Sequence, residues 1–170
     1  MRTILILKRL ITVFYYLIFI GLIAQLFRII NQIITGKIHD LKPKIFGEQL
    51  DYGTMSLFEI GLSGVVPVVL FYCFFQSLIY LKRSLKDLES GNYFSALVIT
   101  NFKKIGILFL VCSLGEVIGK LLFFIVFKSK FHFELDSSVV LFFIMGLFFM
   151  FLSEVFQKAR RLQQENELTI

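Results

Sequence analysis

The sequence predicts an all-α integral membrane protein, in which four transmembrane helices form a bundle with a small extracytoplasmic β element. The prediction rests on four long apolar stretches, a mean hydropathy of +0.81 and a hydrophobic fraction of 57% over 170 residues. The stretches cover residues 10–27, 60–81, 105–127 and 137–153. Each is close to the roughly 20 residues that a helix needs to cross about 30 Å of hydrocarbon. Because lipid offers no hydrogen-bond partners, the backbone must satisfy its own polar groups, as a helix does.

The chain is short enough for one integral membrane domain over residues 1–170. We expect spans at about 10–30, 57–81, 101–127 and 137–156, followed by a cytoplasmic tail over 157–170. Basic residues precede the first span, as in a secretory signal, but no small-x-small cleavage site follows them. We therefore expect the first span to stay uncleaved.

The distribution of basic residues predicts the topology. If the N-terminus is inside, the cytoplasmic segments hold 11 basic residues and the opposite side holds 6, while Lys120 lies within a span. This bias follows the positive-inside rule with both termini cytoplasmic. Topology and attraction to anionic lipid head groups therefore account for the net charge of +6, and we expect no direct nucleic-acid binding. The 11 residues are Arg2, Lys8, Arg9, Lys82, Arg83, Lys86, Lys103, Lys104, Lys158, Arg160 and Arg161, and the 6 are Arg28, Lys37, Lys42, Lys44, Lys128 and Lys130.

Local signals predict several helix ends. Ser56 and Glu59 have the Ser-x-x-Glu spacing of a capping box, so the second helix should begin after Ser56. Gly91 interrupts the helical pattern of the inner loop, and Ser95 is the expected N-cap of the third helix. Pro67 removes one backbone hydrogen bond from the second span, where we expect either a static bend or a hinge.

The outer loop before the fourth span alternates apolar and charged residues over 127–136, which is typical of a strand. Because a lone strand is not stable in water, we expect it to pair with the other external loop around residues 44–52. His132, Glu134 and Asp136 would then share one strand face, an arrangement that could bind a metal.

A metal site is nevertheless not expected. No second histidine accompanies the set on the strand, and the remaining one, His39, lies in the other external loop. The sequence also shows no pair of nucleophile and base at a catalytic spacing. We therefore predict no catalytic residues, no cofactor and no metal.

Glu116 and Lys120 are the chemically costly feature, because both charges lie within the third span. A charge at a helix centre costs about 2.5–3.5 kcal/mol on insertion scales. Their four-residue spacing allows pairing, and Ser113 shares their face, which should turn inward. Gln25 and Glu59 are the partners expected at a similar depth. The set is either an ion pair that fixes helix packing, which the sequence favours, or a site for an ion, proton or small ligand.

Small residues predict close helix packing. Gly115 and Gly119 form a Gly-x-x-x-Gly pattern beside the charged face of the third span. Gly64 and Pro67 are the corresponding candidate packing positions in the second span.

Two segments carry a resemblance to a known family. The inner-loop sequence Leu-Glu-Ser-Gly-Asn-Tyr-Phe-Ser at 88–95 is followed by Asn-Phe-Lys-Lys-Ile-Gly at 101–106, and an acidic residue precedes the final Leu-Thr-Ile. Together they resemble an uncharacterised bacterial family of four-span membrane proteins, domain of unknown function 2975, over nearly the whole chain. Tyr93 departs from the small residues or proline often found there in the family. The motif positions are Gly91, Phe94, Ser95, Asn101, Gly106, Leu162, Gln163, Glu165, Leu168, Thr169 and Ile170.

The resemblance implies a multi-pass protein of the bacterial inner membrane, with both termini cytoplasmic and no established activity. Members of the family are often encoded beside a small Cro/C1-like helix-turn-helix regulator. We therefore expect a non-enzymatic accessory or sensor protein whose partners are the lipid bilayer and such a regulator. The alternative is a small transporter or ion-permeation protein that uses the Glu116–Lys120 pair. The sequence is compatible with a homo-oligomer and leaves the oligomeric state open.

Overall fold

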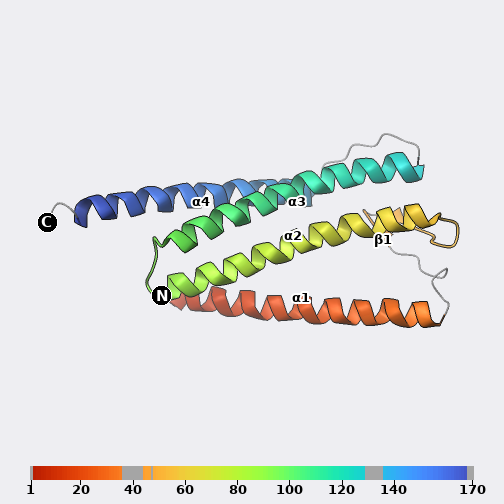
Figure 1. Ribbon diagram of the computed structural model, residues 1–170, viewed down its shortest axis with the longest axis horizontal. Coiled ribbons are helices and arrows are strands. Elements are labelled where there is room, and N and C mark those ends of the chain that lie inside the picture. Colours follow the sequence, from red (N-terminus) through yellow and green to blue (C-terminus); the bar gives the residue numbers. More distant parts are fainter. Residues whose placement is uncertain (1, 36–43, 47, 129–135, 168–170) are drawn as a thin grey trace.

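The computed structural model describes residues 2–35, 44–46, 48–128 and 136–167. Four long helices dominate these residues (Figure 1): α1 (Arg2–Ile34), α2 (Leu57–Glu89), α3 (Ala96–Lys128) and α4 (Ser137–Glu167). Each is long and apolar enough to cross a membrane. The predicted four-helix membrane architecture is therefore consistent with the structure. At 1.5 Å per residue each helix measures roughly 45–50 Å, so each exceeds the apolar spans that the sequence predicts.

The predicted capping box is present at the start of α2. The Ser56 hydroxyl accepts a hydrogen bond from the backbone N–H of Glu59 at 3.3 Å. The Glu59 carboxylate in turn accepts one from the backbone N–H of Ser56 at 2.8 Å. These two bonds satisfy amide groups that would otherwise lack a partner at the helix N-terminus.

The break between α2 and α3 also lies where the sequence predicts it. Gly91 has a φ of 89°, and its N–H donates to the carbonyl of Leu88. The next N–H, that of Asn92, donates to the carbonyl of Asp87, which completes a Schellman-type helix end. The Ser95 hydroxyl then accepts from the third amide of α3 at 3.1 Å and caps that helix.

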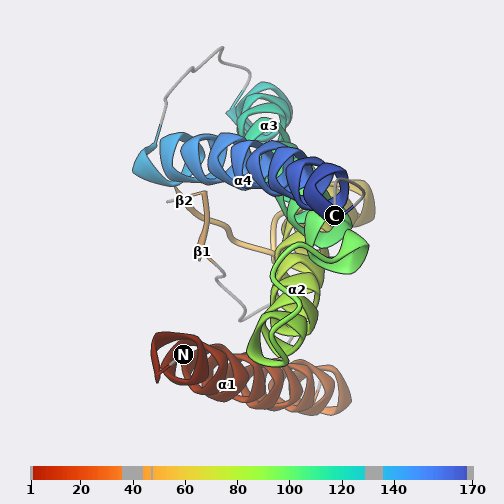
Figure 2. The same cartoon turned by 90° about the vertical axis from the view of Figure 1, so that its left-hand side faces the viewer.

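The helices form an open row in which each packs mainly against its neighbour in sequence (Figure 2). The tightest interface joins α3 and α4, where five buried apolar side chains form the core: Val98, Phe102, Ile105, Phe109 and Phe149. The row ends with α1, which packs against α2. No residue in the apolar segment of α1 is buried. The start of α1 and the end of α4 lie at the same end of the molecule, which we call the terminal end.

The fourth helix is shifted along its axis relative to α3 (Figure 1). The Ser153 hydroxyl donates to the carbonyl of Ile99 at 2.8 Å, so Ser153 lies level with the fourth residue of α3. Near the other end, Lys120 pairs with Asp136, which immediately precedes α4. As a result, residues 121–128 extend past the start of α4 by about 12 Å. Most of residues 154–167 extend past the start of α3 at the terminal end.

The predicted β element is not supported in its predicted form. Two strands of two residues each, β1 (Lys44–Ile45) and β2 (Glu48–Gln49), pair antiparallel with each other inside one loop. Such a short hairpin is too small for an independent sheet. Residues 129–135, which include most of the predicted partner strand together with His132 and Glu134, lie outside the described residues.

Candidate functional site

The charged residues of the third span meet the first turn of α4. The Lys120 ammonium lies 3.7 Å from a carboxylate oxygen of Glu116 and also pairs with the carboxylate of Asp136. The Ser138 hydroxyl donates to Glu116 at 2.7 Å. We call these four residues the polar cluster. Lys120 is only 6% exposed, so its charge is neutralised within the protein rather than by solvent.

Ser113 belongs to the same face of α3 but has a different partner. Its hydroxyl, 3% exposed, donates to the backbone carbonyl of Val139 at 3.0 Å. It therefore binds the first turn of α4 directly and does not bond to the charged pair. Three successive turns of α3, at Ser113, Glu116 and Lys120, thus hold the beginning of α4.

The prediction that Gln25 and Glu59 are the partners of the Glu116–Lys120 pair is wrong. Gln25 is exposed on α1, which among the described elements packs mainly against α2. Glu59 is engaged in the capping box of Ser56. The actual partners come from the start of α4 instead, because the shift of α4 brings Asp136 and Ser138 to the level of the charges. The signal for this was Asp136 itself, an acidic residue at an N-cap position directly before an apolar span.

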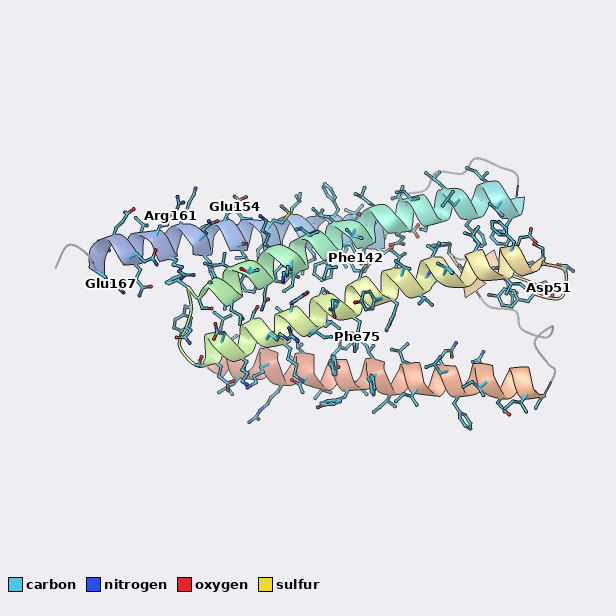
Figure 3. All side chains as sticks on the ribbon, viewed as in Figure 1. Asp51, Phe75, Phe142, Glu154, Arg161 and Glu167 are labelled. Carbon is cyan, nitrogen blue, oxygen red and sulfur yellow. The ribbon has the colours of Figure 1, made fainter. Side chains whose placement is uncertain are left out.

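A cavity of about 340 Å³ adjoins the polar cluster between α2, α3 and α4. Glu116 is the one charged residue that lines the cavity, and Cys112 contributes a polarizable sulfur. The remaining walls are apolar or aromatic: Pro67, Leu70, Phe71, Phe74 and Phe142 (Phe142 is labelled in Figure 3). A carboxylate at the edge of a largely apolar cavity could hold a proton or a small cation. Here one carboxylate oxygen of Glu116 accepts from Ser138 and also lies 3.7 Å from the Lys120 ammonium.

The candidate packing positions behave differently from one another. A Cβ at Gly115 would lie 2.6 Å from Leu70 of α2, and a Cβ at Gly119 would lie 2.6 Å from Val66. Both glycines therefore face α2 at close range. Gly64 does not pack against a neighbouring helix, since no atom of another described element lies within 4 Å of its Cβ position, and its assignment as a packing residue is corrected.

Pro67 lines the cavity beside the polar cluster from the interior of α2. The bend or hinge expected there stays a prediction. Within the described part of the chain, no group of three or more His, Cys, Asp or Glu side chains could hold a metal ion.

A second candidate site lies at the terminal end, between the α2–α3 turn and the last turns of α4. One hollow of about 580 Å³ is lined by Gly91, Asn92, Tyr93, Phe94 and Ser95 from the turn, and by Arg160, Gln163, Gln164 and Glu167 from α4. A neighbouring hollow of about 440 Å³ lies along the same helix and is lined by Phe94, Ala159, Leu162, Gln163, Asn166 and Glu167. We call the two together the terminal groove. The projecting part of α4 carries Arg161 and Glu167, as Figure 3 shows.

The terminal groove is built on aromatic packing. The ring of Phe94 meets that of Phe156 edge-on at 5.6 Å between centroids, and Phe102 contacts the same ring at 5.5 Å. The turn itself is held by the bond between the Ser95 hydroxyl and the Asp87 carboxylate. These contacts fix the α2–α3 turn against α4, so the groove has a rigid wall.

The structure brings five of the motif positions together at the terminal groove: Gly91, Phe94, Ser95, Leu162 and Gln163. Gly106 instead lies where α3 crosses α4, since a Cβ there would be 2.8 Å from the carbonyl oxygen of Gly146. Asn101 is buried in α3, and its Nδ2 finds no hydrogen-bond partner within the described structure. Glu165 is exposed near the end of α4, and residues 168–170 lie outside the described residues.

Comparison with known proteins identifies the family. The profile described as protein of unknown function DUF2975 matches residues 57–170, which comprise α2, α3 and α4 and leave α1 outside the match. The match is thus narrower than the resemblance expected over nearly the whole chain. No curated protein and no solved structure matches the chain. Since the matched segment covers well over half of the residues and contains both candidate sites, the chain belongs to the DUF2975 family.

Proposed function

We propose that this chain is a non-enzymatic multi-pass protein of the cell membrane that holds a small cytoplasmic helix-turn-helix regulator in the terminal groove. One observation carries the proposal: two motif segments that lie about 70 residues apart in sequence form a single groove at the end of α4. Both segments lie at helix ends, so crossing the bilayer does not by itself require these motif residues. A shared binding surface explains why the two segments meet.

The location of the groove suits a soluble partner. Eleven basic residues at the terminal end belong to described helices, and such an excess favours the cytoplasmic side under the positive-inside rule. The shift of α4 carries the groove beyond the level at which α3 begins. A cytoplasmic protein could therefore reach it without entering the bilayer.

The chemistry of the groove fits an amphipathic helix. Phe94 and Leu162 supply apolar surface, while Arg160, Gln163 and Glu167 supply hydrogen-bonding groups of both charge signs. A helix in a groove typically inserts apolar side chains at positions i, i+3 or i+4 and i+7, with polar residues around them. Helix-turn-helix regulators consist largely of such helices.

The test uses a Cro/C1-like regulator of the kind often encoded beside members of the family, purified and added to the full-length protein in nanodiscs. A photocrosslinking amino acid at Gln163, inside the groove, should capture the regulator. The same amino acid at Gln157, an exposed position of α4 outside the groove, should not. Phe94→Ala should weaken binding, because it removes the aromatic wall that both hollows share.

Deletion of residues 161–170 provides the stronger perturbation and should abolish co-purification of the regulator. Equal crosslinking from Gln163 and Gln157, or full binding after the deletion, would contradict the proposal. The matched pair of positions matters because both lie on the same projecting part of α4 and differ in whether they line the groove.

A second candidate function, ion or proton permeation, is favoured by one observation: Glu116 lines the apolar cavity beside the polar cluster. This proposal expects proton flux into reconstituted vesicles containing a trapped pH dye. Glu116→Gln should abolish the flux, whereas Glu154→Gln, at an exposed carboxylate of α4, should leave it unchanged. Flux that persists in the Glu116 variant would exclude this role.

A further inference from the structure

A groove between α1 and α2 near the terminal end has a basic rim and an aromatic wall. Its volume is about 620 Å³, within the range of roughly 300–1,000 Å³ that is typical of ligand sites. Four cationic residues form the rim: Lys8, Lys82, Arg83 and Lys86. The wall toward the middle of the helices consists of Tyr15, Tyr16, Phe19 and Ile79. Charge and apolar surface are therefore separated along the groove.

The charge at the rim is largely uncompensated. Glu89 pairs with Lys8, and both side chains are about one-third exposed. Within the described residues, Lys82, Arg83 and Lys86 form no ion pair. Four cations and one carboxylate leave a formal charge of +3 around a single groove.

Aromatic rings position one of these cations. The ammonium of Lys82 lies 5.0 Å from the ring centroid of Tyr15 and 5.4 Å from that of Tyr16, which are cation–π distances. Tyr15 also stacks on Phe75 with centroids 4.8 Å apart, so its ring is fixed to α2. The Lys82 charge is thus held at the boundary between the basic rim and the aromatic wall.

The wall is open to the surroundings of the protein along α1, an apolar helix that is long enough to cross a membrane. Tyr16 and Phe19 are 55% and 46% exposed, and no residue in the apolar segment of α1 is buried. A water-soluble anion would match the rim but would leave this wall uncovered. An amphiphile with a phosphate head group and an acyl chain matches both parts, and basic pockets between transmembrane helices are known to bind anionic lipid head groups.

We propose that this groove is a binding site for one anionic phospholipid, with the phosphate diester at Lys82, Arg83 and Lys86 and an acyl chain along Tyr16 and Phe19. The site joins α1 to α2 through the bound lipid. It lies outside the terminal groove and the polar cluster, and it does not depend on the function proposed above.

The chain contains no tryptophan, so Phe19→Trp introduces a single fluorophore at the acyl wall. The full-length variant is reconstituted in phosphatidylcholine vesicles that contain a small fraction of brominated phosphatidylglycerol or, in parallel, of brominated phosphatidylcholine. Brominated phosphatidylglycerol should quench the fluorescence several-fold more effectively at equal mole fraction. Equal quenching by the two lipids would overturn the proposal.

Arg83→Gln combined with Lys86→Gln should remove this preference. Each basic residue near the surface contributes roughly a fivefold preference for anionic lipid, so the pair should lower the relative affinity by about thirtyfold. The matched control, Lys103→Gln with Lys158→Gln, removes two exposed cations from the same end of α3 and α4 and should keep the preference. Loss of the preference in both double variants would overturn the site in favour of general surface charge.

Two further arms keep the test decisive. Arg83→Lys with Lys86→Arg retains both charges and should retain the preference, so its loss would contradict the proposal. Excess inorganic phosphate should leave the quenching unchanged, because it offers no acyl chain for the aromatic wall. Displacement of the lipid by phosphate would reassign the groove to a soluble anion.

Discussion

The crossing of α3 and α4 provides the sharpest test of how the helices associate, through the substitution Gly106→Ala. A Cβ at this position would lie 2.6 Å from Cγ of Met150, 2.8 Å from the carbonyl oxygen of Gly146 and 3.0 Å from the backbone N of Met150. Two of these three atoms belong to the backbone of α4. A side-chain rotation alone therefore does not relieve the overlap, and the two helices must separate.

The expected magnitude follows from overpacking. Extra methylenes in a well-packed interior typically cost about 1–3 kcal/mol. Here the cost should lie in the upper half of that range, because close backbone approach is what small residues provide at helix contacts in lipid. Gly115→Ala should cost less, since its Cβ would meet the flexible end of Leu70 at 2.6 Å and no backbone atom within 4 Å.

Gly64→Ala is the matched control, because the same methyl group would enter open space on a helix. Replacing a helical glycine by alanine gains up to about 1 kcal/mol of helix propensity, so this variant should be as stable as the parent or slightly more stable. The assay is unfolding in mixed micelles of increasing SDS fraction, followed by circular dichroism. A Gly106→Ala variant as stable as Gly64→Ala would refute the close crossing of α3 and α4.

Three other predictions follow from the helix ends and the polar cluster. Lys120→Met should destabilise the fold by about 3–5 kcal/mol, because it removes the buried cation that pairs with the Glu116 carboxylate, which is only 15% exposed. Adding Glu116→Gln should recover part of the loss in the same SDS titration. Ser56→Ala should cost about 0.5–2 kcal/mol by removing the N-cap of α2, whereas Ser56→Thr, which keeps the hydroxyl, should cost little. Gly91→Ala should cost roughly 1–2 kcal/mol because its φ of 89° disfavours any side chain, and Gly91→Asn should be better tolerated than Gly91→Ala. If the SDS midpoint of Lys120→Met, Ser56→Ala or Gly91→Ala equalled that of the parent, the structural role assigned to that residue would be contradicted.

The helices and their ends could be predicted because their causes are local. A capping box at Ser56, a helix-ending glycine at 91 and an N-cap at Ser95 act through atoms only a few residues away. The apolar stretches likewise follow from the cost of exposing backbone to lipid. These features require no knowledge of which helix packs against which.

The partners of the charged pair could not be predicted, because they depend on the axial register between α3 and α4. The sequence located Glu116 and Lys120 on an inward face, but any polar residue at a similar depth was a candidate partner. The axial shift of α4 determines which residues pair with Glu116 and Lys120. That shift results from the contact of Gly106 with Gly146 and from the Ser153–Ile99 hydrogen bond. The terminal groove depends on the same register, since it forms only where α4 passes the α2–α3 turn.

The shift of α4 also has a consequence for the surrounding bilayer. At the end opposite the terminal end, α2 and α3 extend farther than α4, because residues 121–128 of α3 have no counterpart on α4. The lipid leaflet at that end therefore meets a shorter helix on the α4 side of the protein. Lipid there must thin locally to match the shorter wall, at a cost of a fraction of a kcal/mol per Å of mismatch. We therefore expect the protein to prefer thin, short-chain membranes, and long-chain lipids to strain the contact between Asp136 and Lys120.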